Sequence, residues 1–123
     1  MNAKSPGRDP RALVVDADAF TRRRVADTLT GAGFEVSAVD GADAAFAAFL
    51  QSGPFALMVL DVEMQGMGGP QFADSLRDPG RDQPVLFISA GPRPYLHPGQ
   101  RFLSKGSVPD QLLAAIRRLL DGA

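Results

Sequence analysis

The chain contains no cysteine. This absence excludes a disulfide framework, a thiolate metal site and a cysteine nucleophile. Long apolar runs are also missing, so no segment can span a bilayer, and the first residues lack the basic and then apolar pattern of a signal peptide. We therefore expect a cytoplasmic protein that has no membrane partner.

A strong charge imbalance is absent as well. The 13 basic and 14 acidic side chains give a formal net charge of −1. Domains that bind nucleic acid usually have a clear excess of basic residues, so this balance predicts no nucleic-acid partner. No phosphate-binding glycine motif, G-x-G-x-x-G or G-x-x-x-x-G-K-S/T, follows a predicted strand, and a nucleotide-dependent enzyme is therefore disfavoured.

The length of 123 residues is typical of one domain. A chain of this size buries roughly two thirds of the surface that it exposes when unfolded. Residues 1–10 contain two prolines, a glycine and almost nothing apolar, which predicts a flexible N-terminal tail. Residues 11–123 are predicted to form a single domain.

Short apolar runs alternate with segments of helical periodicity. The predicted strands are Arg11–Asp16, Phe34–Val39, Phe55–Asp61, Pro84–Ala90 and Arg101–Lys105. The predicted helices run from Ala19 to about Ala32, from Ala42 to Leu50, from Pro70 to about Arg77, and from Pro109 onwards. Asp40 is the expected N-cap of the second helix. The alternation predicts an α/β fold whose parallel sheet is covered by helices on both faces.

One helix is missing from this alternation. The segment between Ser89 and Lys105 has prolines where a helix is due, namely Pro92, Pro94 and Pro98. Proline disfavours a regular helix, and the residues from Ala90 to Gln100 reach about 36–40 Å when extended, which is long enough to connect two parallel strands. We expect a Pro/Gly-rich loop in place of the fourth helix, with at most one turn around Tyr95–His97.

Four predicted strands end in polar side chains: Asp16, Asp61, Ser89 and Lys105. In a parallel α/β sheet, ligands bind beyond the carboxyl ends of the strands, so these side chains are expected to meet. A carboxylate can attack phosphorus, while lysine and serine can bind the transferred oxygens. Magnesium suits the site because it needs only one or two protein carboxylates. The sequence therefore predicts phosphoryl transfer, with Asp61 as the nucleophile and Asp16 as a metal ligand.

The segments VVDAD, MVLDVEMQGMGG, LFISA and FLSKG follow one another in the order and spacing of a known family. The chain resembles the receiver domain of two-component response regulators over about residues 11 to 121. The resemblance implies a flavodoxin-like, doubly wound, five-stranded sheet of order 2-1-3-4-5. It also implies that Asp61 is the phosphoacceptor, assisted by Lys105 and Ser89.

The same resemblance implies further roles at the site. The backbone carbonyl of Glu63 would bind magnesium together with Asp16 and Asp61. Phe102, three residues before the lysine, would be the rotameric switch that acts with Ser89.

The sequence departs from the family pattern at the metal site. Ala17 stands where the family has a second acid, which is usually a direct metal ligand. Loss of one charge partner at about 4 Å removes about 4 kcal/mol before compensation, at an effective dielectric constant near 20. We therefore expect weak magnesium binding, with Asp18 as a further candidate ligand.

Two more departures lie in loops. Gly68 replaces the usual aspartate, and Gly106 replaces a proline that in the family follows a cis peptide bond. A non-proline cis bond costs about 3 kcal/mol, so we expect the Lys105–Gly106 peptide to be trans.

Other polar residues are assigned to the surface. The run from Arg22 to Arg24 is expected to form a solvated helix face. His97 is expected to be an exposed loop residue, because no second metal ligand accompanies it. Tyr95 and Leu96 are candidates for packing the loop down or for contacting a partner.

The leading hypothesis is a stand-alone receiver that takes a phosphoryl group from a histidine kinase or histidine phosphotransferase and signals through protein contact. It would be a monomer or weak dimer, and not an enzyme beyond catalysing its own phosphorylation and dephosphorylation. The alternative is a degenerate pseudo-receiver that binds proteins without phosphorylation, which Ala17, Gly68 and Gly106 favour. The downstream partner is not identified by the sequence.

Overall fold

The computed structural model describes residues 10–77 and 83–121. Residues 1–9 of the expected tail lie outside this range, and Pro10 is held in place because its carbonyl accepts a hydrogen bond from the Glu35 N–H (2.8 Å). No helix in the described ranges is long and apolar enough to cross a membrane.

Five parallel strands form one sheet in the order β2-β1-β3-β4-β5, which confirms the expected flavodoxin-like topology. The strands are β1 (Arg11–Val15), β2 (Glu35–Val39), β3 (Leu57–Asp61), β4 (Val85–Ser89) and β5 (Gln100–Ser104). The three central strands are buried along almost their whole length, and this explains their continuous apolar runs.

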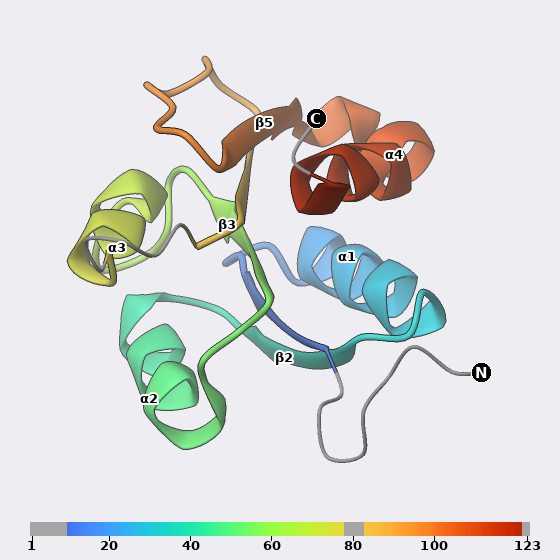
Figure 1. The fold of residues 1–123 in the computed structure, drawn as a ribbon. Coiled ribbons are helices and arrows are strands. Elements are labelled where there is room, and N and C mark those ends of the chain that lie inside the picture. The colour runs from blue at the N-terminus through green and yellow to red at the C-terminus, as the bar shows by residue number, and fades with distance from the viewer. Residues whose placement is uncertain (1–9, 78–82, 122–123) are drawn as a thin grey trace.

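Helices cover both faces of the sheet (Figure 1). One face carries α1 (Ala19–Gly31) and α4 (Val108–Asp121), and the other carries α2 (Ala42–Ser52) and α3 (Gly69–Ser75). Successive residues of a strand point to opposite faces. Val14 therefore belongs to the core under α1 and α4, and Val15 to the core under α2 and α3.

The N-terminus of α2 differs from the sequence-based expectation. Gly41, and not Asp40, is the N-cap residue, and no side chain caps the helix. The first free N–H of the helix, on Ala42, instead donates to the Gln65 carbonyl (3.0 Å). A contact with a distant loop has thus replaced the local cap.

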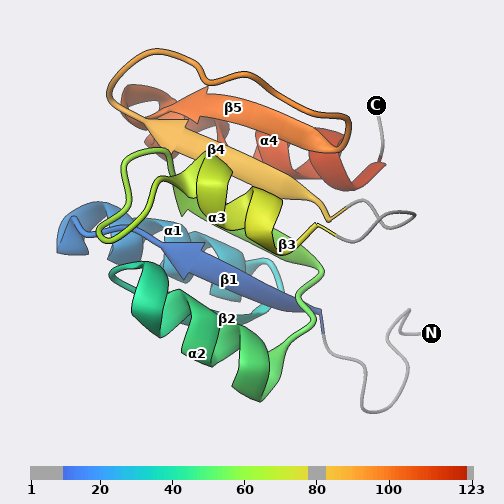
Figure 2. The same cartoon turned by 90° about the vertical axis from the view of Figure 1, so that its left-hand side faces the viewer.

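No helix connects β4 to β5, as expected, because residues 90–99 form a loop that runs beside β5 (Figure 2). Leu96 and Phe102 each pack against the core on the α2–α3 side of the sheet, where the missing helix would lie. His97, expected to be exposed, is instead half-buried, with its Nε2 3.7 Å from Asp74 Oδ1 of α3. The loop is therefore anchored on the sheet and on α3.

Candidate functional site

The carboxyl ends of β1, β3 and β5 bring three charged side chains together. The Lys105 ammonium lies 3.1 Å from Asp16 Oδ2 and 3.3 Å from Asp61 Oδ2. Asp16 is fully buried, and Asp61 is 6% exposed. The chain thus places one cation between two carboxylates that are largely removed from water, at the sheet edge where ligands of such folds bind.

The Asp61 carboxylate is held at both oxygens. The Glu63 N–H donates to Asp61 Oδ1 (3.1 Å), and the Lys105 ammonium donates to Oδ2 (3.3 Å). These two bonds fix the orientation of the carboxylate, while its remaining lone pairs are available to a ligand. They also place the backbone of Glu63 at the site.

Asp16 is the least satisfied member of the cluster. Its Oδ1 accepts hydrogen bonds from the Asp18 N–H (2.8 Å) and from Lys105 (3.2 Å). Its buried Oδ2 accepts no hydrogen bond from any described residue, although the ammonium lies close to it. Burial raises the pKa of Asp16 above its ordinary value, and the bonds from Asp18 and Lys105 only partly oppose this effect.

Lys105 keeps its charge in this setting. Burial alone would lower the pKa of its ammonium, but the hydrogen bond and charge of Asp16, together with those of Asp61, outweigh that effect and raise it. The Lys105–Gly106 peptide is trans, as expected. The short 3₁₀ turn η1 (Lys105–Ser107) begins at this residue, and the ammonium reaches both carboxylates without the family's proline.

Asp18 has a structural task in this molecule. It is the N-cap of α1, where its Oδ1 accepts from the Phe20 N–H (3.3 Å) and its Oδ2 from the Thr21 hydroxyl (2.6 Å). The bond from Thr21 is the main reason that the pKa of Asp18 is lowered. Both carboxylate oxygens are therefore engaged, and Ala17 offers no ligand atom in its side chain.

Ser89 ends β4, the neighbour of the strand that carries Asp61, whereas Phe102 lies in the middle of β5. Ser89 is buried at the end of β4, and its hydroxyl oxygen accepts a hydrogen bond from the Gly91 N–H (2.8 Å). A hydroxyl that accepts a bond still has its own proton to donate. Phe102 is half-buried on β5 and packs against the core under α2 and α3.

Two residues of the site were not found from the sequence. Arg22, assigned to a solvated face, donates from Nη1 to the backbone carbonyl of Asp16 (2.9 Å). Gly69 packs so closely against Asp61 that a Cβ atom there would collide with the Asp61 carbonyl. The Gly68-Gly69 pair before Pro70 was the one signal of this close approach.

The donor set fits a divalent cation that keeps most of its waters. No group of three histidine, aspartate or glutamate side chains converges anywhere in residues 10–77 and 83–121. The two carboxylates of Asp16 and Asp61 do converge, and the Asp16 Oδ2 atom is buried without a hydrogen bond. Magnesium binds through one or two carboxylates, so these residues suit it, though with few protein ligands.

Comparison with known proteins agrees with the observed fold. The sequence model of the response regulator receiver domain matches residues 12–117. The chain belongs to the response regulator receiver family. The receiver matches the response regulator protein FleR of Pseudomonas aeruginosa at 36% identity over 80 residues, which is 65% of this chain.

Two further matches extend this result. The sensor histidine kinase GacS of Pseudomonas protegens is 39% identical over 88 residues, or 68% of this chain. The chain spans only 17% of the length of FleR and 10% of that of GacS. A response regulator receiver protein of Sinorhizobium medicae is 27% identical, with a TM-score of 0.80 over 95% of this receiver and 98% of that chain.

Proposed function

We propose that this receiver accepts a phosphoryl group on Asp61 from a histidine kinase or histidine phosphotransferase and passes the signal on by protein contact in the cytoplasm. The observation that carries the proposal is the Lys105 ammonium held between Asp16 and Asp61 at the carboxyl edge of the sheet. A nucleophilic carboxylate and a fixed cation are the two groups that phosphoryl transfer needs from a protein.

In the proposed reaction, an Asp61 carboxylate oxygen attacks the phosphorus of a phosphohistidine. The new O–P bond forms as the N–P bond breaks, and the imidazole leaves with the electron pair and takes up a proton. Lys105 then pairs with a phosphoryl oxygen, and the Ser89 O–H donates to another. The raised pKa of Lys105 supports this role because it keeps the ammonium charged at neutral pH.

The proposed cofactor is magnesium, bound weakly. Asp16, Asp61 and the Glu63 carbonyl would hold it, and it would neutralise charge on the phosphoryl oxygens. Asp18 would have to give up its bonds to Thr21 and Phe20 before its carboxylate could take part. The weak affinity follows from Ala17, which removes one ligand and one negative charge.

The proposed output passes through Ser89 to the loop at residues 90–99. The Ser89 hydroxyl oxygen now holds the Gly91 N–H at the start of this loop. Rotation of the hydroxyl toward a phosphoryl group would weaken that bond and loosen the loop whose Leu96 packs against the core on the α2–α3 side. Phosphorylation would thus change the order of a loop, and no helix would have to slide.

Acetyl phosphate with magnesium tests the proposal directly. Intact-mass analysis of the wild-type chain should record the gain of one phosphoryl group, and Asp61→Asn should record none. Equal modification of both proteins, or of neither, would contradict the proposal and leave the pseudo-receiver as the better hypothesis. Beryllofluoride gives a second readout, because NMR shifts clustered at Asp61 and Phe102 are expected only from a working acceptor.

A further inference from the structure

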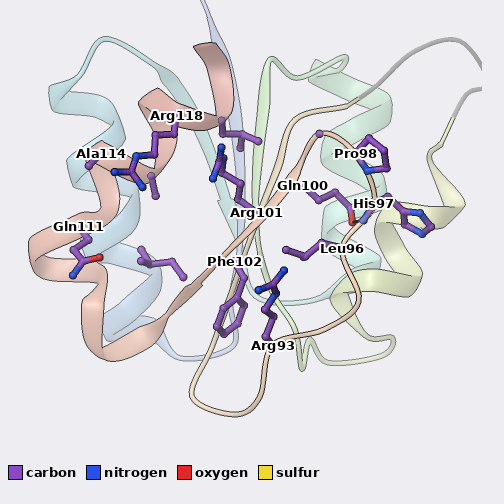
Figure 3. A pocket seen from close by; sticks show the side chains of 14 residues that line it. Arg93, Leu96, His97, Pro98, Gln100, Arg101, Phe102, Gln111, Ala114 and Arg118 are labelled. Atoms are coloured by element: carbon purple, nitrogen blue, oxygen red, sulfur yellow. Dashed lines mark hydrogen bonds between the residues drawn. The ribbon is translucent and has the colours of Figure 1, made fainter. Parts of the chain in front are cut away.

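The loop that replaces the fourth helix opens a groove along β5. The groove has a volume of about 990 Å³ and lies between the loop on one side and α4 on the other (Figure 3). Its charged lining comes from three elements and consists of Arg93, Arg101 and Arg118. Leu96 and Phe102 add an apolar part on the loop side.

The groove is locally basic in a chain whose net charge is −1. No aspartate or glutamate lines it. None of its arginines forms an ion pair with another residue of the described ranges. The free charge of the groove therefore complements an acidic ligand.

The backbone of β5 adds a second kind of binding group. β5 is the last strand of the sheet and pairs only with β4. The Val85 N–H of β4 donates to the carbonyl of Gly99, the residue just before β5. In a parallel ladder the backbone N–H and C=O of every second residue face the neighbouring strand, so those of Gly99 and Arg101 face β4. By this alternation, the N–H and C=O of Phe102 point away from β4 and into the groove, where they can pair with an added strand.

We propose that the groove binds an acidic, extended segment of a partner protein as an additional strand along β5. Arg101 shares its face of the sheet with Leu103, which packs under α4, so Arg101 and Arg118 lie on the α4 side. Phe102 points to the opposite, loop side. The side chains of an added strand would also point alternately to the two faces of the sheet. The preferred sequence is therefore acid–apolar–acid, with both acids toward Arg101 and Arg118 and the apolar side chain toward Leu96 and Phe102.

The charge of the groove also argues against two other occupants. Edge-to-edge pairing of two copies of this chain would bring their Arg101 side chains near one another, and charged residues on an edge strand oppose such pairing. A nucleic acid would satisfy the arginines, but it would leave the backbone groups of β5 without a strand partner.

The test uses a short fluorescein-labelled peptide of alternating aspartate and valine, titrated into the unphosphorylated full chain. Anisotropy should report binding, and the amide signals of Phe102 and Ser104 should shift by NMR. The double variant Arg101→Glu/Arg118→Glu should weaken binding by about tenfold or more. Arg117→Glu is the matched control, because it changes charge on the same helix outside the groove, and it should bind the peptide like wild type.

Several results would overturn the proposal. One is that the peptide does not bind at millimolar concentration, and another is that a lysine–valine peptide binds as tightly as the aspartate–valine peptide. A third is that Arg117→Glu weakens binding as much as the double variant does. A fourth is that a single-stranded oligonucleotide displaces the labelled peptide at a lower concentration than the unlabelled peptide does. Concentration-dependent dimerisation that the peptide does not reverse would assign the groove to a second copy. Asp61→Asn should bind the peptide like wild type, because the peptide test does not depend on whether Asp61 accepts a phosphoryl group.

Discussion

The ammonium of Lys105 lies 3.1 Å from Asp16 Oδ2 and 3.3 Å from Asp61 Oδ2. A single cation thus lies between two largely buried carboxylates that are far apart in the sequence. Like charges this close repel one another unless a cation or a proton lies between them. The stability of the receiver and the chemistry of its site therefore depend on the same three groups.

Lys105→Met should destabilise the fold and slow phosphorylation. Removal of one partner from a buried ion cluster is strongly destabilising, but the lysine is 23% exposed at its side chain, so we expect a loss of about 2 kcal/mol at pH 7. The loss should shrink as the pH falls toward 4, because a proton on Asp16 then replaces the missing cation. Urea unfolding at both pH values measures this effect. Exposed Arg117→Met is the control, and a loss that does not depend on pH would contradict the argument.

Asp16→Asn should stabilise the chain and impair its function. Burial raises the pKa of Asp16, so the fold favours its protonated form. Its contribution to stability is complete below the ordinary value of 3.8 and is lost as the pH rises through the raised pKa. Asparagine avoids that loss, and the variant should be more stable than wild type by about 1 kcal/mol at pH 7.

The advantage of Asp16→Asn should be smaller at pH 4 than at pH 7. It should also shrink when magnesium is added, because magnesium stabilises only the chain that binds it. Urea unfolding with and without magnesium measures both effects. An asparagine variant that is less stable than wild type at pH 7 without magnesium would show that the ion pair outweighs the desolvation of Asp16.

Gly69→Ala should disturb Asp61 through the backbone. A Cβ at Gly69 would collide with the Asp61 carbonyl, which belongs to β3 and cannot move cheaply. We expect a loss of about 2 kcal/mol in unfolding free energy and slower phosphoryl uptake. Gly31→Ala is the matched control, because nothing lies within 4 Å of its Cβ position, and it should stabilise α1 by about 0.5 kcal/mol. Similar effects of the two substitutions would exclude the steric explanation.

Ser89→Ala should loosen the start of the loop. It removes the acceptor of the Gly91 N–H, so hydrogen exchange of that amide should become about tenfold faster. Ser89→Thr keeps the hydroxyl and should exchange like wild type, as should Ser104→Ala at the end of the neighbouring strand. Slow exchange over a regular helix within residues 91–100 would contradict the loop itself.

Much of the fold was predictable because both faces of the sheet are covered. Burial on two sides makes strands such as β3 continuously apolar, and this marks their positions in the sequence. The missing helix was equally visible, since Pro92, Pro94 and Pro98 exclude it by local geometry. The convergence of Asp16 and Asp61 followed from the parallel topology alone.

The errors concern contacts between distant segments. Helical periodicity assigns Arg22 to a helix surface, but it cannot predict that the guanidinium extends back to bind the Asp16 carbonyl. Asp40 was the best local cap for α2, but the Gln65 carbonyl satisfies the helix from another loop. The His97–Asp74 pair likewise joins two segments whose approach no short pattern encodes.

Ala17→Asp should restore magnesium affinity. The substitution adds a carboxylate beside Asp16, at the position where the family has its second acid. An added charge partner is worth up to about 4 kcal/mol before compensation, and desolvation reduces this, so we expect magnesium to bind about tenfold tighter than in wild type. NMR titration measures both affinities. Ala19→Asp adds the same charge in the first turn of α1 and should change affinity little. Micromolar binding of magnesium by the wild-type chain would mean that other residues of the site compensate for Ala17. Asp18→Asn would then be the first substitution to examine.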